Sequence, residues 1–174
     1  MRRFSVFSIL LFIVLSAAMS ISTSAQTNGE SVQNNDAAAE RINAIFISTI
    51  KQGKFVLDNN VHGYTFIPPS NEDLAEIKTM GSKAIAALVQ HLNSQGSRDQ
   101  WLAIRFLGCV GGEGVVKPLG DFVLSSHSGT FRLIALKYLS EAPWASIREY
   151  VSHAANDTEP AVRKESLRIE AAHR

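Results

Sequence analysis

Residues 101–120 read WLAIRFLGCVGGEGVVKPLG, and this stretch decides the fold. Its first part places apolar residues at helical spacing as far as Leu107. Four glycines, Gly108, Gly111, Gly112 and Gly114, then interrupt the pattern before a second apolar run. The stretch therefore predicts two short amphipathic helices joined by a glycine turn. Such a pair buries its apolar face only against neighbouring helices, so the flanking sequence should supply further pairs.

The same two-helix pattern recurs through residues 70–174. Apolar residues at one place in the second helix of three successive pairs lie 31 residues apart, namely Ile85, Val116 and Ile147. Leu88, Leu119 and Tyr150 repeat the same spacing. A period near 31 residues that contains two helices is typical of an α-solenoid, in which each unit stacks on the next. We therefore expect an all-α fold, an α-solenoid of stacked antiparallel helix pairs.

Capping and turn residues give the expected bounds of these helices. Ser70 with Asp73 should cap the first helix, Gly81 should end it, and Ser82 should cap the second helix, which runs to Leu92. The later helices are expected at residues 99–110, 113–125, 130–141 and 143–155, with a final single helix at 160–173.

Three parts of the sequence carry a resemblance to a known family. They are residues 101–108 with 115–119, the turn residue Asp157 followed by Pro160-Ala161-Val162-Arg163, and Phe131-Arg132 one period earlier. They resemble the short HEAT-like repeats of the kind also seen in phycobilin lyases, over about residues 71–172. Gln100 departs from the pattern, because Arg132 and Arg163 hold the equivalent place in later units. The resemblance implies about three and a half repeats that form an interaction scaffold, and it does not imply lyase activity.

The region before the repeats divides into two parts. Residues 26–36 are polar and low in apolar residues, which predicts a flexible tether. Residues 37–69 should form one N-terminal helix followed by a short extended strap or hairpin at 55–67, where β-favouring residues flank Asp58.

The first 25 residues predict an export signal. Arg2 and Arg3 precede an apolar run, and small residues at Thr23 and Ala25 suit cleavage after Ala25. The run is shorter than a membrane span and is broken by serines, although an uncleaved anchor remains the alternative. We expect an exported protein, periplasmic or secreted, without stable membrane insertion once the signal is cleaved.

Charge and cysteine content exclude two classes of protein. The formal net charge of the 174-residue chain is +1, and it becomes −1 when Arg2 and Arg3 are removed with the leader. This balance lacks the basic excess of a nucleic-acid-binding protein. Cys109 is the single cysteine, so an intramolecular disulfide is impossible, and its apolar neighbours predict a small buried side chain.

No motif for catalysis or for a cofactor stands out. The five histidines lack the close pairing of zinc ligands, and the glycines after Leu107 lack the Lys-Ser or Lys-Thr pair of a phosphate loop. Ser125 and His127 are near neighbours, but adjacency supplies neither an activated nucleophile nor an oxyanion site. We therefore expect no metal, no cofactor and no enzymatic activity.

Two surfaces are candidates for binding a protein or peptide. The first is a strip on the second helices, made of Gln90, His91, Asp121, Phe122, Ser152 and His153. The alternative is that these positions are merely solvated and that Phe122 turns into the core. The second surface is the strap, with Asp58, His62 and Tyr64, which could equally cap the apolar edge of the first repeat.

These patterns favour a protein-protein interaction scaffold or adaptor whose partner is another protein. The alternative function is a small hydrolase or lyase with its site in the strap at residues 55–67. Convergence of Asp58, His62 and Tyr64 on a pocket would favour the enzyme.

Overall fold

The computed structural model describes residues 36–51, 56–57, 64–65, 69–125 and 127–174. Residues 38–174 form one compact unit, and residues 1–37 belong to another. The predicted leader and the predicted tether as far as residue 35 lie outside the described residues. Asp36, the last residue of the predicted tether, is already helical.

The described residues contain eight α-helices, which confirms the expected all-α class. The first helix covers residues 36–51. The other helices, with one short 3-10 turn (η1), are α2 (Asn71–Met80), α3 (Ser82–Leu92), α4 (Ser97–Val110), η1 (Glu113–Val115), α5 (Val116–Val123), α6 (Gly129–Leu139), α7 (Trp144–Ala154) and α8 (Pro160–Ala172). Within the predicted strap, β1 (Val56–Leu57) and β2 (Tyr64–Thr65) pair antiparallel, as the hairpin alternative requires.

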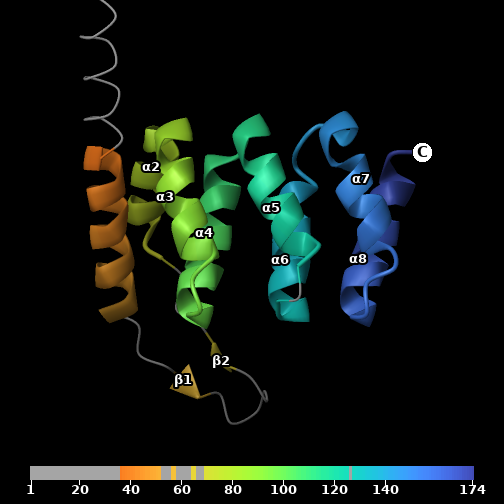
Figure 1. The fold of residues 1–174 in the computed structure, drawn as a ribbon, viewed down its shortest axis with the longest axis horizontal. Coiled ribbons are helices and arrows are strands. Elements are labelled where there is room, and N and C mark those ends of the chain that lie inside the picture. Colours follow the sequence, from red (N-terminus) through yellow and green to blue (C-terminus); the bar gives the residue numbers. More distant parts are fainter. Residues whose placement is uncertain (1–35, 52–55, 58–63, 66–68, 126) are drawn as a thin grey trace, which may run out of the picture. The chain divides into compact units, whose positions relative to one another are not determined.

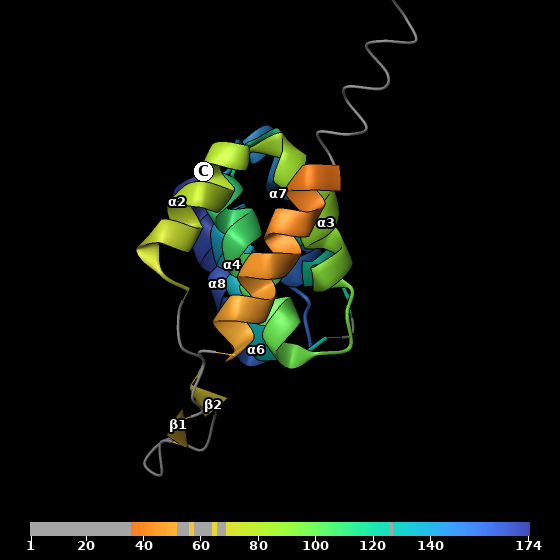
Figure 2. The same cartoon turned by 90° about the vertical axis from the view of Figure 1, so that its left-hand side faces the viewer.

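The helices of the compact unit stack in two rows. Helices α2, α4, α6 and α8 contact one another in succession, while α3 contacts η1 and α5 contacts α7 (Figure 1). Figure 2 looks along the stack, so that successive helices overlap. One apolar core runs between the rows, and its fully buried side chains include Phe46, Ile77, Leu88, Phe106, Leu119, Leu136 and Ile147.

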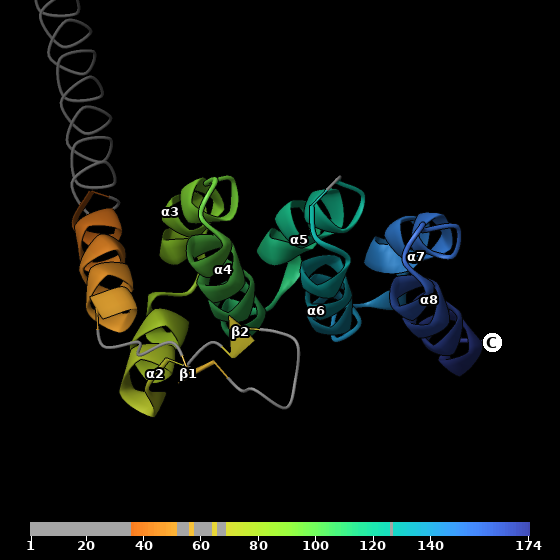
Figure 3. The ribbon, with the colours of Figure 1, turned by 90° about the horizontal axis from the view of Figure 1, so that it is seen from below.

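The helices pair differently from the expectation. Among helices that follow one another in the chain, α3 packs extensively on α4, α5 on α6 and α7 on α8, whereas α2 and α3 touch much less (Figure 3). The expected final helix at 160–173 is found as α8, which packs on both α7 and α6. A sequence period fixes the length of the repeating unit, but it does not say which neighbouring helices within it pack most closely.

Caps at the first repeat follow the sequence with one exception. The Ser70 hydroxyl accepts a hydrogen bond from the Asp73 backbone N–H at 3.0 Å, as predicted. Gly81, with φ of 56°, ends α2 as expected. The predicted Ser82 cap is wrong, because Gly81 itself occupies the N-cap of α3 and Ser82 is the first helical residue.

The glycine turn after α4 is confirmed. Gly111 and Gly112 have φ of 64° and 74°, values that other residues rarely adopt, and they lie between α4 and η1. Cys109, near this turn, is only half-buried, which corrects the expectation of a buried thiol. It lies at the edge of the α2–α4 contact, where its Sγ donates to the backbone oxygen of Leu74 at 3.4 Å.

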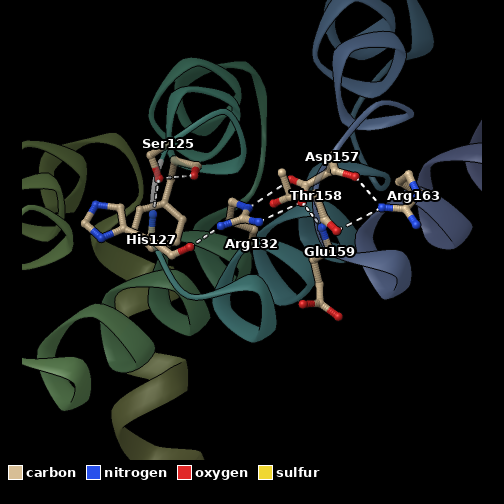
Figure 4. A network of polar contacts seen from close by, with 8 residues as sticks. Ser125, His127, Arg132, Asp157, Thr158, Glu159 and Arg163 are labelled. Carbon is tan, nitrogen blue, oxygen red and sulfur yellow. Dashed lines mark hydrogen bonds and ion pairs between the residues drawn. The ribbon is translucent and has the colours of Figure 1, made fainter.

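Equivalent side chains close the turn before each of three helices. Gln100 Nε2 donates to the backbone oxygen of Ser94 at 2.7 Å, and Arg132 Nη1 donates to that of His127. Arg163 Nη1 donates to the backbone oxygens of Asp157 and Thr158 at 2.6 and 2.9 Å (Figure 4). Gln100 therefore does for its turn what arginine does in the later units.

Two of these side chains also reach the next turn along the stack. Gln100 Nε2 lies 3.3 Å from His127 Nδ1. Arg132 donates two hydrogen bonds to the Asp157 carboxylate, from Nε at 2.9 Å and from Nη2 at 2.6 Å. The turns before α4, α6 and α8 are thus joined by a continuous series of polar contacts, of which Figure 4 shows the part from His127 to Arg163. Hydrogen bonds to a charged group are among the stronger ones in proteins, so this series fixes the spacing of the stack.

Candidate protein-binding surface

The outward faces of α3, α5 and α7 carry two exposed rows of side chains at the 31-residue spacing. One row is Gln90, Asp121 and Ser152, all from the predicted strip. The second row lies one helical turn earlier and consists of Ala86, Lys117 and Arg148. We call these six residues the second-helix face. Because each row repeats from unit to unit, a partner can contact several units at once.

Two residues of the predicted strip do not belong to this face. Phe122 is buried at 3% exposure and stacks on the His127 ring, with centroids 4.5 Å apart. His91 is half-buried and stacks on Phe46 of the first helix, with centroids 3.7 Å apart and an interplanar angle of 12°. Both positions lie at the edge of the helix face, where neighbouring elements cover them. The alternative that Phe122 turns into the core is therefore confirmed, and His91 is half-buried where the strip requires an exposed side chain.

The His91 ring instead holds the first helix against α3. Its Nε2 lies 2.8 Å from the Asn43 side-chain oxygen, and because that oxygen accepts, Nε2 carries the hydrogen. Burial lowers the pKa of His91, and the charge of Asp99 on α4 only partly opposes this. The ring is accordingly neutral at pH 7.

A pocket lies at the α7 end of the predicted strip. Ser152 and His153 lie beside Trp144, Arg148 and Glu149 of α7, and Glu170 of α8 completes the lining. The pocket has a volume of about 430 Å³ and opens to solvent. It combines an aromatic ring, charges of both signs and a hydroxyl, a mixture typical of surfaces that bind peptides.

Hydrogen bonding sets the chemistry of His153 in this pocket. Its Nδ1 lies 2.8 Å from the backbone oxygen of Glu149, and since a carbonyl only accepts, Nδ1 carries the hydrogen. The Trp144 ring is fixed from the other side by His173, with centroids 4.7 Å apart.

The sequence analysis missed four lining residues, Trp144, Arg148, Glu149 and Glu170. A signal for two of them existed, because Trp144, Arg148 and Ser152 follow one another at spacings of four residues on one side of a helix. Arg148 also lies one period after Lys117. Nothing in the pattern of α8 marked Glu170, which reaches the pocket only through the packing of α8 on α7.

The charges on the second-helix face remain close to balance. Lys117 binds Asp121 one turn later at 2.7 Å, and this contact raises the pKa of the Lys117 ammonium. Glu170 lies 3.4 Å from Arg174 beside the pocket. A face of this kind recognises a partner mainly through local contacts, with little long-range steering.

Most of the predicted strap lies outside the described residues. Asp58 and His62 lie outside the described residues, and of Tyr64 only the backbone in β2 is described. Within the described ranges, no group of three or more His, Cys, Asp or Glu side chains could hold a metal ion. The convergence that would favour an enzyme therefore finds no observation in its support.

Comparisons with models of protein families, with curated proteins and with solved structures gave no match to this chain. No described helix combines the length and the apolar character needed to cross a membrane.

Proposed function

We propose that the protein is an exported scaffold built of about three and a half HEAT-like repeats, and that its second-helix face binds another protein. The observation that carries the proposal is the pair of exposed rows, Ala86-Lys117-Arg148 and Gln90-Asp121-Ser152, which repeat at 31 residues over three stacked helices. Repeat stacks commonly present such continuous surfaces to partners.

The turn contacts support the HEAT-like part of this proposal. Gln100, Arg132 and Arg163 make the same hydrogen bond to the preceding turn, at the positions that the resemblance aligned. Helical packing that recurs with the same polar contact in three units is what a true repeat requires. The leader sequence supports export to the periplasm or outside the cell.

The pocket beside α8 supports a peptide or protein as the ligand. Trp144 offers a large ring that is already stacked on His173, and Arg148, Glu149 and His153 line the same pocket. Aromatic and arginine side chains dominate the binding energy of many protein interfaces. We expect the partner to place one or two side chains in this pocket and to extend along the rows toward α5 and α3.

Site-specific photocrosslinking in the native cell envelope tests the proposal. A photoreactive amino acid is introduced at Lys117 or at Arg148, and, as a matched control, at the exposed Lys78 of α2. We expect one common protein adduct at 117 and 148 and its absence at 78. Absence of any adduct at both test positions, or an equal yield at 78, would refute binding by this face.

A further inference from the structure

The α6–α8 interface combines three groups of α6. Arg132 binds the Asp157 carboxylate of the turn that precedes α8. Leu136 is fully buried. Glu165 of α8 has a lowered pKa, chiefly through its hydrogen bond from Arg168, and the positive charge of Lys137 on α6 adds to this. The interface therefore joins a cation and a buried apolar residue of α6 to the Asp157 carboxylate, and it places Lys137 within electrostatic reach of Glu165.

Helix α8 repeats the same three groups 31 residues later. Arg163 takes the place of Arg132, Leu167 that of Leu136, and Arg168 that of Lys137. The burial is reversed, however, because Leu167 is 54% exposed while Leu136 is fully buried. Among the described residues, no further helix covers this face. We call Arg163, Leu167 and Arg168 the α8 triad.

The arginines of the triad retain donors for a partner. Arg163 uses Nη1 for the turn oxygens of Asp157 and Thr158, just as Arg132 uses Nη1 for His127. On Arg132 the other two nitrogens hold a carboxylate, whereas on Arg163 no described residue accepts from them (Figure 4). The exposed Arg168 binds the mostly buried Glu165 through Nε and Nη2, which leaves its Nη1.

We propose that the α8 triad binds an acidic turn followed by a helix, supplied by another polypeptide. A carboxylate in the partner's turn pairs with Arg163, and an apolar side chain of the helix that follows covers Leu167, with Arg168 beside it. The geometry is that by which α6 holds α8 in this same molecule. Arginine and carboxylate form two parallel hydrogen bonds, which gives the contact its specificity.

Charge argues against a second copy of the chain as the occupant. Two α8 triads brought together would bring their arginines near one another, and like charges repel. The acidic segment of the chain itself, from Asp157 to Glu165, already packs on α6. A partner rich in carboxylates is complementary where a copy is not.

A peptide from this chain is a suitable probe, because it already binds the equivalent face of α6. The probe is a fluorescent peptide of residues 154–173, made helical by a side-chain staple that replaces Lys164 and Arg168, both of which point to solvent in α8. It is titrated into the chain of residues 26–174, which retains the whole compact unit. The control probe carries Asp157→Asn and Glu165→Gln.

We expect saturable binding that weakens about tenfold or more with the control probe, and equally with Leu167→Glu in the protein. Leu124→Glu is the matched protein control, since Leu124 is a similarly exposed leucine, at 48%, on another helix end. It should leave binding unchanged. Lack of saturable binding up to about 1 mM peptide would overturn the proposal, as would equal binding by the Leu167→Glu protein. A dimer of the chain that Leu167→Glu dissolves would overturn it in favour of a second copy.

Discussion

Arg132 and Asp157 form a two-pronged ion pair that joins the turn before α6 to the turn before α8. Both side chains are about nine-tenths buried, at 9% and 10% exposure. The same Asp157 carboxylate accepts from the backbone N–H of Glu159 at 2.7 Å, next to the start of α8. One carboxylate therefore sets both the start of a helix and the spacing between two units.

Replacing this carboxylate should destabilise the whole stack. Asp157→Asn leaves the Arg132 guanidinium buried without its counter-charge, and loss of one member of a buried pair costs about 3 kcal/mol of unfolding free energy. Urea unfolding of wild type and Asp157→Asn at pH 7 measures this loss of unfolding free energy. Asp121→Asn is the control, because the exposed Lys117–Asp121 pair is worth less than about 1 kcal/mol. Equal losses in the two variants would show that Asp157 does not tie the units together.

The same ion pair should make stability depend on acid pH. The hydrogen bond from Arg132 lowers the pKa of Asp157 below its ordinary 3.8, against the opposing effect of burial. A lowered carboxyl pKa contributes stability that is complete above 3.8 and is lost as the pH falls through the folded value. The difference in unfolding free energy between wild type and Asp157→Asn should therefore shrink well below pH 3.8. A difference that stays constant there would contradict the pairing.

Gly120 of α5 lies so close to Tyr150 of α7 that adding a methyl group at Gly120 should change the stability of the protein. A Cβ on Gly120 would lie 2.5 to 2.6 Å from three ring atoms of Tyr150. Alanine in a helix gains about 1 kcal/mol over glycine, but overpacking costs about 1 to 3 kcal/mol, so Gly120→Ala should lower stability. In a Tyr150→Ala background the same change should be neutral or stabilising. Thermal unfolding of wild type, the two single variants and the double variant measures these changes. A higher unfolding midpoint for the single variant Gly120→Ala would contradict the close packing of Gly120 on Tyr150.

The stack of His91 on Phe46 predicts a second, milder pH dependence. Burial lowers the pKa of His91 from 6.5, so the unfolded chain binds its proton more readily. The stability that this group contributes is complete above pH 6.5 and is lost as the pH falls through the folded value. Hydrogen exchange of residues 38–51 should therefore quicken between pH 7.5 and 5 beyond the intrinsic effect of pH.

Phenylalanine at position 91 provides the control for this effect. His91→Phe keeps an aromatic ring on Phe46 but removes the titration, so its exchange should show a flatter pH profile. His153→Phe changes an exposed histidine and should retain the profile of the wild type. An unchanged profile in His91→Phe would assign the pH effect to another group.

Much of the fold follows from local sequence. The spacing of Ile85, Val116 and Ile147 marks positions that all turn inward, and each of these helices begins and ends within a few residues of its predicted bounds. Ser70 and Gly111 act as caps because their effect depends on the adjacent backbone alone. These features need no knowledge of distant neighbours.

The errors arose where a distant neighbour decides the environment. His91 reads as exposed within its own unit, but the first helix, which lies outside the repeat, covers it with Phe46. Phe122 lies at the same register in the next unit, and there His127 from the following loop stacks on it. A helical period assigns a side chain to a face, whereas its burial depends on which element packs over the edge of that face.

Binding by the second-helix face is the central claim, and the affinity of the crosslinked partner tests it most directly. The purified partner is titrated against wild type, against the double variant Arg148→Glu and Ser152→Glu, and against Lys78→Glu as a control on α2. All three changed residues are exposed, so the variants should keep the fold. We predict a dissociation constant about tenfold or more higher for the double variant and unchanged for the control. Equal affinity for wild type and the double variant would contradict the account.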